Sequence, residues 1–426
     1  MFVALPVDAA GRSRLLPWTL PFRFFVSAAL FHAAAWPLLF AAADDVPRFQ
    51  GGLGPVLGAL HALTLGTLMS TVMGASLQLL PVATVQAVAS QRLAALLWWI
   101  YTPSAACLVA GMSLPHPALL AAGTAGTVAA VVLFAALLGH NLARAKRQQD
   151  SVLHGWVAWG AMLLAAATAT LLVRWYGGAA LPDPRAFARA HLVLGVFGFM
   201  SVLAAGFSYI LVPMFAVTRQ PAEGLRRGVL GAAVAGVALA LAGAFLDASP
   251  WLPGAAAGVG SVAAAVHVGA MAREVRRRMR PEMGPWFVLV ALGWAMLIAC
   301  LPVGLAVAAG AWPERGPALF GALAVGGWLL SFVLGVLSRI APFLASVHAM
   351  GSRRAPPLVA TLTPMRPLRA HQALHALALA GVLGGIAADS GALVRAGAAL
   401  GCAGGVAYLA FVAGVVRRLR KGRSQA

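Results

Sequence analysis

The residues best able to do chemistry are histidines that lie inside long apolar stretches. His32, His61, His191 and His267 each occupy such a stretch. A neutral imidazole offers a lone pair to a transition metal. An ionisable residue within a membrane span is costly and is therefore a candidate for function. These four histidines are the first candidates for a site.

A second group of histidines lies near the start of a later apolar stretch. His371 and His375 are four residues apart, with His348 nearby on the same expected side of the membrane. This spacing places both side chains on one helix face and can bind a transition metal. The alternative is a pair that faces solvent at a helix start. Three further histidines, in loops or at the ends of spans, are expected to face solvent: His116, His140 and His154.

The elements that must position these residues are membrane-spanning helices. Of the 426 residues, 61% are hydrophobic and 10% are charged, whereas soluble domains are about half apolar and about a quarter charged. A helix needs about 20 apolar residues to cross the hydrocarbon core. The sequence predicts an all-α, polytopic membrane protein with one membrane domain over 1–426. Its predicted spans are 21–43, 54–80, 93–113, 117–142, 153–174, 190–215, 226–246, 253–272, 285–309, 317–345, 370–388 and 392–416.

The basic residues predict how the chain is oriented. Short cytoplasmic loops hold most of the Lys and Arg of a membrane protein. With the N-terminus inside, only six of the 31 Lys and Arg fall in external loops, and Arg339 alone lies within a span. We therefore expect both termini in the cytoplasm, with residues 1–25 as a cytoplasmic tail and not a signal peptide. The six external residues are Arg48, Arg174, Arg185, Arg189, Arg315 and Arg395.

Several classes of function are disfavoured by composition. No basic stretch is interleaved with exposed aromatic residues, so we expect no nucleic-acid partner. Cys107, Cys300 and Cys402 lie far apart in apolar stretches and form no Cys-x-x-Cys motif, so we expect no disulfide framework or zinc site. No Asp or Glu lies inside a predicted span, and proton pumps relay protons through buried carboxylates. We therefore do not expect proton pumping.

A three-residue pattern repeats in the second, sixth and tenth predicted spans. A glycine is followed by another eight residues later and by a proline seven residues after that, and successive copies are offset by 132 and then 129 residues. Such glycines allow helices or a flat ligand to approach closely. The pattern predicts three four-helix units, at about 1–146, 147–278 and 279–426. The three copies are Gly66, Gly74 and Pro81; Gly198, Gly206 and Pro213; and Gly327, Gly335 and Pro342.

This arrangement resembles subunit I of the haem-copper oxidase superfamily, which includes cytochrome oxidases and nitric oxide reductases. In topology the resemblance covers nearly the whole chain. The sequence segments that carry it specifically are LHALTLGTLMSTVMGASLQLLPVA, RAHLVLGVFGFMSVLAAGFSYILVPMFAV and GWLLSFVLGVLSRIAPFL. It implies a bacterial inner-membrane location, a respiratory electron donor or small gas as partner, and a b-type haem. It also implies that His61 is a haem ligand, and it places His191 where the family has a copper ligand.

The sequence departs from the superfamily where the reaction centre would lie. Phe320, Gly321 and Ala322 occupy the region of the two tenth-span haem histidines, and the seventh span, 226–246, contains no histidine. The paired copper ligands are therefore absent. Gly195 stands where some oxidases carry a crosslinked tyrosine. We do not expect reduction of oxygen to water, although copper binding and another oxidoreductase activity stay open.

Three hypotheses remain from the sequence. The first is a haem b protein that uses His61 with His191 or His32 as second ligand, because two imidazoles give a six-coordinate haem that transfers electrons, whereas one leaves a position for NO, CO or O2. The second is a cofactor-free, twelve-helix small-molecule transporter, although such carriers commonly repeat every six spans. The third is an assembly protein on an oxidase scaffold without cofactors. The sequence does not indicate an oligomeric state.

Overall fold

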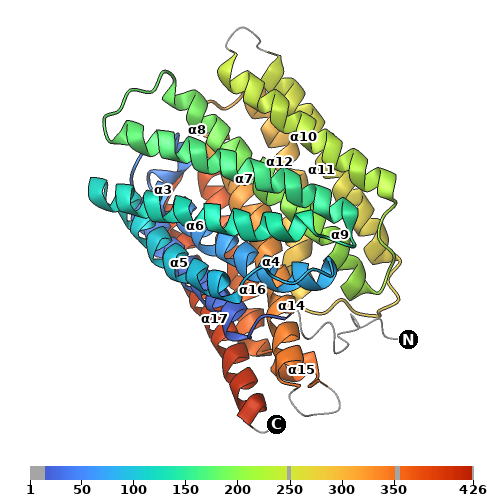
Figure 1. The fold of residues 1–426 in the computed structure, drawn as a ribbon. Helices are drawn as coiled ribbons and strands as arrows, with labels where there is room; N and C mark the ends of the chain where they lie inside the picture. The colour runs from blue at the N-terminus through green and yellow to red at the C-terminus, as the bar shows by residue number, and fades with distance from the viewer. Residues whose placement is uncertain (1–14, 247–250, 351–355, 425–426) are drawn as a thin grey trace.

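The computed structural model describes residues 15–246, 251–350 and 356–424, and this part of the chain is helical throughout its regular elements. Within these ranges, twelve helices are long and apolar enough to cross a membrane (Figure 1). The predicted number of spans is confirmed. Arg12, Arg14, Arg353 and Arg354, which the sequence assigns to the cytoplasmic side, lie outside the described residues.

The spans begin within six residues, and end within eight residues, of the predicted positions. The long helices are α2 (Thr19–Ala41), α3 (Pro55–His61) with η2 (Ala62–Met69) and α4 (Ser70–Ala83), α5 (Gln91–Ser113), α6 (Pro117–Ala143), α7 (Gln149–Tyr176), α8 (Pro184–Leu192) with η3 (Val193–Ser201) and α9 (Val202–Ala216), α10 (Glu223–Phe245), α11 (Leu252–Arg276), α12 (Trp286–Ala308), α13 (Gly316–Gly321) with η4 (Ala322–Leu330) and α14 (Ser331–His348), α16 (Met365–Ala387) and α17 (Gly391–Ser424). Two short helices, η1 (Val46–Arg48) and α15 (Val359–Leu362), lie between spans.

The second, sixth and tenth spans each contain a π-helical segment, which the sequence did not predict. The segments are η2, η3 and η4, of eight, nine and nine residues. π-helical turns are rare and often occur at functional sites. Two side-chain hydroxyls in or next to these segments donate hydrogen bonds to the carbonyl five residues earlier. Thr67 donates to Ala62 O at 3.2 Å, and Ser331 donates to Gly326 O at 3.4 Å.

The repeated glycines are contact points between helices. A Cβ on Gly66 would lie 2.3 Å from Phe31 of α2, and one on Gly198 would lie 2.9 Å from Ala161 of α7. A Cβ on Gly327 would likewise lie 2.9 Å from Met296 of α12. The second glycines follow the same rule: Gly74 contacts α2, Gly206 contacts α7 and Gly335 contacts α12. Each of the three spans therefore packs closely on the span before it.

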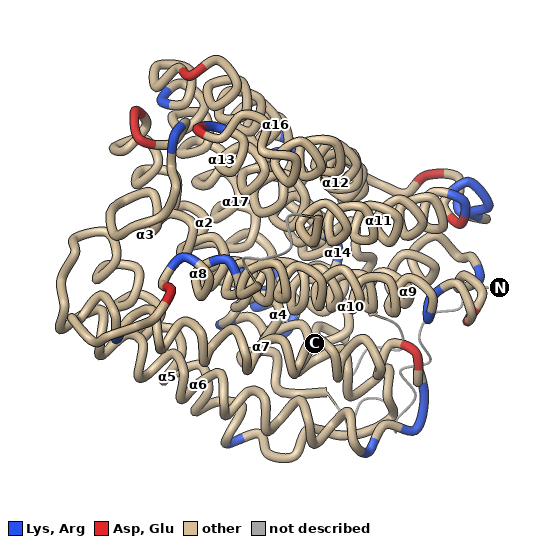
Figure 2. The backbone as a smooth tube through the Cα atoms, turned by 90° about the horizontal axis from the view of Figure 1, so that it is seen from above, with Lys and Arg blue, Asp and Glu red and all other residues tan. Residues whose placement is uncertain are grey.

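The remaining spans pack mainly as antiparallel neighbours. α5 lies along α6, α10 along α11, and α16 along α17. α17 also packs along α2, so that the first and last spans are neighbours (Figure 2). Two ion pairs lie at one end of these helices: Arg48 of η1 pairs with Asp389, and Arg395 of α17 pairs with Asp44.

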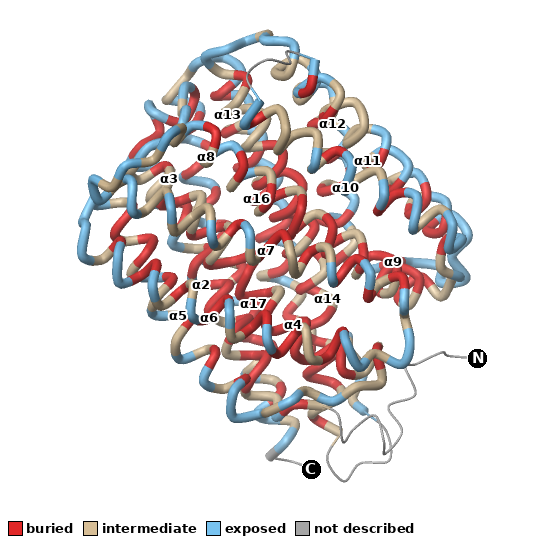
Figure 3. The backbone as a smooth tube through the Cα atoms, turned by 45° about the horizontal axis from the view of Figure 1, so that its top comes forward, coloured by how far each residue is buried: buried red, intermediate tan, exposed pale blue. Residues whose placement is uncertain are grey.

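Burial and charge are distributed as expected for a membrane bundle. Buried residues concentrate along the central helices, and exposed residues lie on the outside (Figure 3). Lys, Arg, Asp and Glu lie mainly near the ends of helices (Figure 2). The long helices with the π-helical segments are among the most buried of the spans, so the residues at their ends and centres are held by packing on several sides.

Gly335→Ala is expected to destabilise the protein by about 1–3 kcal/mol, because overpacking a close helix contact forces backbone shifts. The added Cβ would lie 2.9 Å from Val290 N and 3.0 Å from Trp286 O, and neither backbone atom can rotate away. Thermal unfolding in detergent measures the effect. Gly231→Ala is the matched control, since nothing lies within 4 Å of its Cβ position. Equal melting temperatures for the two variants would contradict this packing.

Candidate functional site

His61 and His191 form the first group, the paired histidines. His61 is the last residue of α3 and precedes η2, and His191 lies near the end of α8 and precedes η3. Their ring centroids are 6.2 Å apart and the ring planes differ by only 11°. The two residues lie at different positions of the repeat, yet their side chains meet. Two of the sequence's candidate ligands, 130 residues apart along the chain, are thus brought together.

Hydrogen bonds fix which nitrogen of each paired histidine is free. His61 Nδ1 lies 3.0 Å from Leu57 O, and His191 Nδ1 lies 3.0 Å from Ala165 O. A carbonyl oxygen only accepts a hydrogen bond, so each Nδ1 donates and carries the proton. In a neutral imidazole the lone pair then resides on Nε2. Both rings are half-buried, and each offers Nε2 as a metal ligand.

His32, His371 and His375 form the second group, the trihistidine cluster. His32 lies in the middle of α2, while His371 and His375 lie in the second and third turns of α16. All three are buried, and one ring nitrogen of each lies within 4.8 Å of one ring nitrogen of each other residue. His371 and His375 therefore do lie together, as predicted. The third histidine beside them is His32, not His348.

The solvent-facing alternative for His371 and His375 is wrong. α16 begins at Met365, five residues before the predicted start, and this extra helical turn carries both side chains into the bundle. His348 lies elsewhere, with its Nε2 atom 3.4 Å from Gln78 Nε2. His32 lies in this cluster, so His191, and not His32, is the partner that the structure brings to His61.

His154, Tyr209 and His267 form the third group, the tyrosine-linked pair. His267 Nδ1 lies 3.0 Å from Tyr209 Oη, and the Tyr209 ring also packs against His154 with centroids 5.5 Å apart. Both histidines are buried, and the Nε2 atom of each has no hydrogen bond. The expectation that His154 faces solvent is wrong, because α7 begins at Gln149, four residues early, and turns His154 inward. His116 is exposed as expected, while His140 is half-buried.

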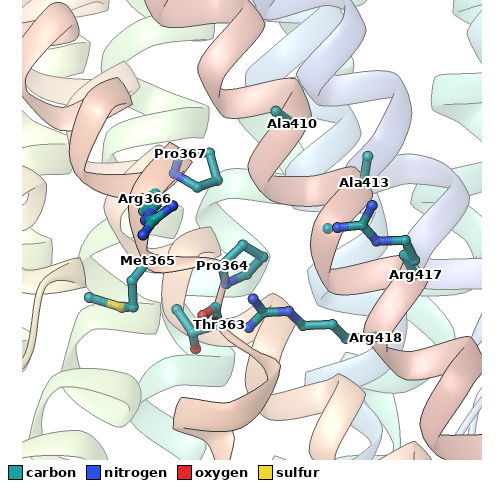
Figure 4. A pocket seen from close by; sticks show the side chains of 10 residues that line it. Thr363, Pro364, Met365, Arg366, Pro367, Ala410, Ala413, Arg417 and Arg418 are labelled. Atoms are coloured by element: carbon teal, nitrogen blue, oxygen red, sulfur yellow. Dashed lines mark hydrogen bonds between the residues drawn. The ribbon is translucent and has the colours of Figure 1, made fainter.

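One cavity lies away from all three histidine groups. It has a volume of about 850 Å³ and lies between the start of α16 and α17 (Figure 4). Arg366, Arg417 and Arg418 line it, and Arg418 donates to the carbonyls of Thr361 and Thr363 at 2.9 Å each. Its lining contains no histidine. The cavity suits an anionic group at the membrane interface.

The sequence could not have located two tyrosines that complete these groups. Tyr408 of α17 packs on His371 with ring centroids 4.6 Å apart, and Tyr209 bonds to His267. Only four tyrosines occur in the chain, and two of them lie beside buried histidines. That scarcity is the one signal that could have pointed to them.

Comparisons with protein-family models and with curated proteins found no match for this chain. The functional inference therefore rests on the geometry of the histidines and on the resemblance of the sequence patterns.

Proposed function

We propose that the protein is a divergent, haem-copper oxidase subunit I-like membrane protein that binds one b-type haem and transfers electrons. The paired histidines are the proposed axial ligands. The observation that carries this proposal is the parallel placement of His61 and His191, with ring centroids 6.2 Å apart and planes 11° apart.

The separation of the two rings suits one metal ion between them. An imidazole nitrogen lies about 2.0–2.1 Å from a bound metal. With about 1 Å more from each nitrogen to its ring centre, two axial imidazoles have centroids about 6 Å apart. The distance in the structure is 6.2 Å. This spacing fits two imidazoles on one metal ion, and it also lies within the range of ring packing.

The hydrogen bonds of the paired histidines also suit a haem. Metal-bound histidines usually donate their other ring N–H to a carbonyl or carboxylate, which fixes the ring and strengthens the ligand. Leu57 O and Ala165 O are the acceptors for His61 and His191. The sequence contains no Cys-x-x-Cys-His attachment motif, so the haem would be held without a covalent link, as in b-type proteins.

Two axial imidazoles favour electron transfer over gas chemistry. A six-coordinate haem exchanges electrons and has no vacant position for NO or O2. A gas-sensing or gas-detoxifying role would require one of the paired histidines to leave the iron. The partner would be a respiratory electron donor. A bound haem would supply the redox chemistry. His61 and His191 would hold it, and apolar helices would surround it.

The three-unit architecture and orientation belong to the same proposal. In each proposed unit (1–146, 147–278 and 279–426) the second span contains a π-helical segment, and its two repeated glycines contact the first span. An even number of spans returns the chain to its starting side. With the arginines in short cytoplasmic loops, both termini face the cytoplasm of a bacterial inner membrane, and the paired histidines lie toward its external face.

A visible spectrum of the detergent-solubilised protein from haem-replete cells is expected to contain a Soret band and sharp bands of a six-coordinate haem on reduction. His61→Ala and His191→Ala should each remove haem or leave it five-coordinate, because each deletes one axial nitrogen. His116→Ala is the matched control, since this histidine is exposed and lies in a loop. Its spectrum should equal that of the wild type.

Absence of a Soret band in the wild-type protein would favour a carrier or an assembly protein over an electron-transfer protein. An unchanged spectrum in both histidine variants would show that other residues ligate the iron. Either result would overturn the proposal.

Reporter fusions test the orientation. A fluorescent protein that matures only in the cytoplasm is expected to be bright when it is fused after residue 426. Alkaline phosphatase inserted in the loop after α6 is expected to be inactive, because this loop faces the cytoplasm in the proposed orientation. An insertion in the loop between α5 and α6, beside His116, should give active phosphatase. The opposite pattern would contradict cytoplasmic termini.

A further inference from the structure

The trihistidine cluster is the most enclosed group of ligand atoms in the described part of the chain. His32 and His371 have no exposed surface, and His375 is 1% exposed. One ring nitrogen of each lies within 4.8 Å of the corresponding atoms of the other two. Three imidazoles around one metal at about 2.0–2.1 Å have nitrogens about 3.3–3.5 Å apart. Small rotations of the rings would reach this arrangement.

His371 and His375, here called the α16 pair, each make one hydrogen bond that leaves one ring nitrogen with a free lone pair. His371 Nδ1 lies 3.0 Å from Gly404 O and must donate to it, so the lone pair is on Nε2. His375 Nε2 lies 2.8 Å from Ser331 Oγ. Ser331 Oγ also lies 3.4 Å from Gly326 O. When Ser331 donates to this carbonyl, it accepts from His375 Nε2, and the lone pair of His375 is then on Nδ1. Both free atoms are buried without a hydrogen bond, as are both nitrogens of His32.

Three uncompensated lone pairs in an apolar interior are costly. A buried polar group without a partner destabilises the folded state, and the low local dielectric increases this penalty. A water molecule could donate to two of the three lone pairs and would leave one unpaired. A metal ion satisfies all three, so a metal ion is the occupant that fits the group best.

We propose that His32, His371 and His375 bind a single copper ion in the monovalent state. The group contains no carboxylate and no thiolate, so the charge of the ion is not neutralised by its ligands. The cost of burying an ion in a low-dielectric medium rises steeply with charge, which disfavours a divalent ion at this depth. Imidazole is a good ligand for copper, and Cu(I) is the monovalent transition ion that cells handle.

Buried aromatic residues surround the cluster. Trp36 and Tyr408 are buried beside the cluster, with ring centroids 6.0 Å and 5.7 Å from that of His32. Glycines of α17 allow this helix to approach the two helices that carry the ligands: a Cβ on Gly401 would lie 2.1 Å from Trp36 of α2, and one on Gly397 would lie 2.7 Å from Val382 N of α16. Gly404 O and Ser331 Oγ orient the rings of His371 and His375.

This site differs from the copper position that the resemblance implies. The resemblance places copper ligands on the sixth and seventh spans, and the seventh span, α10, has no histidine. The trihistidine cluster lies on the first and eleventh spans, α2 and α16. The proposal does not depend on haem binding by the paired histidines.

Copper loading of the full-length protein tests the proposal. The purified, detergent-solubilised chain is incubated with Cu(I) in the presence of a competing Cu(I) chelator, and bound copper is measured by elemental analysis. We expect about one copper per chain, with a Cu K-edge absorption spectrum that fits three nitrogen neighbours at about 2.0 Å. Zn²⁺ added at equal concentration should not displace it.

Substitutions of the ligands give the second readout. His371→Gln and His375→Gln should each weaken Cu(I) binding more than about tenfold, since loss of even an orienting partner costs about 10–100-fold. His154→Gln is the matched control, because His154 is equally buried but belongs to the tyrosine-linked pair. This variant should bind copper as the wild type does.

Three results would overturn the proposal. They are absence of bound copper in the wild type, equal copper binding by His375→Gln and the wild type, and preferential binding of Zn²⁺. The wild-type absorption spectrum is independent of whether a variant folds. A spectrum with sulfur neighbours or with fewer than two nitrogen neighbours would also contradict a trihistidine site.

Discussion

The need to satisfy polar groups inside an apolar bundle constrains this structure most. In hydrocarbon a nitrogen without a partner has no water to bind, so each buried imidazole must find a hydrogen bond, a metal or both. In the paired histidines and in the α16 pair, one ring nitrogen is hydrogen-bonded and the other carries a free lone pair. That division of roles is what the proposed haem and copper sites share.

The helices that carry these rings are fixed by contacts that leave little freedom. The repeated glycines place the second, sixth and tenth spans against the spans before them, and the π-helical segments begin directly after His61 and soon after His191. A wider helical turn changes the direction of side chains on either side of it. Local backbone geometry and helix packing thus act together to bring two distant histidines into parallel orientation.

Much of the fold could be predicted from the sequence, because a bilayer imposes a simple rule on length and hydrophobicity. All twelve spans and the contact role of Gly66, Gly198 and Gly327 followed from that rule and from the repeat. The partners of His32 did not. Hydrophobicity fixes where a span begins only to within about one turn, and such shifts at α7 and α16 decided whether His154, His371 and His375 face solvent or the interior.

The central proposal is that His61 and His191 would together hold the iron of one haem. Low-temperature electron paramagnetic resonance of the oxidised, full-length protein tests it most directly. The account predicts the signal of a low-spin ferric haem with two imidazole ligands, and its replacement by a high-spin signal in His191→Ala. A high-spin signal in the wild-type protein, or a low-spin signal that survives loss of both histidines, would contradict it.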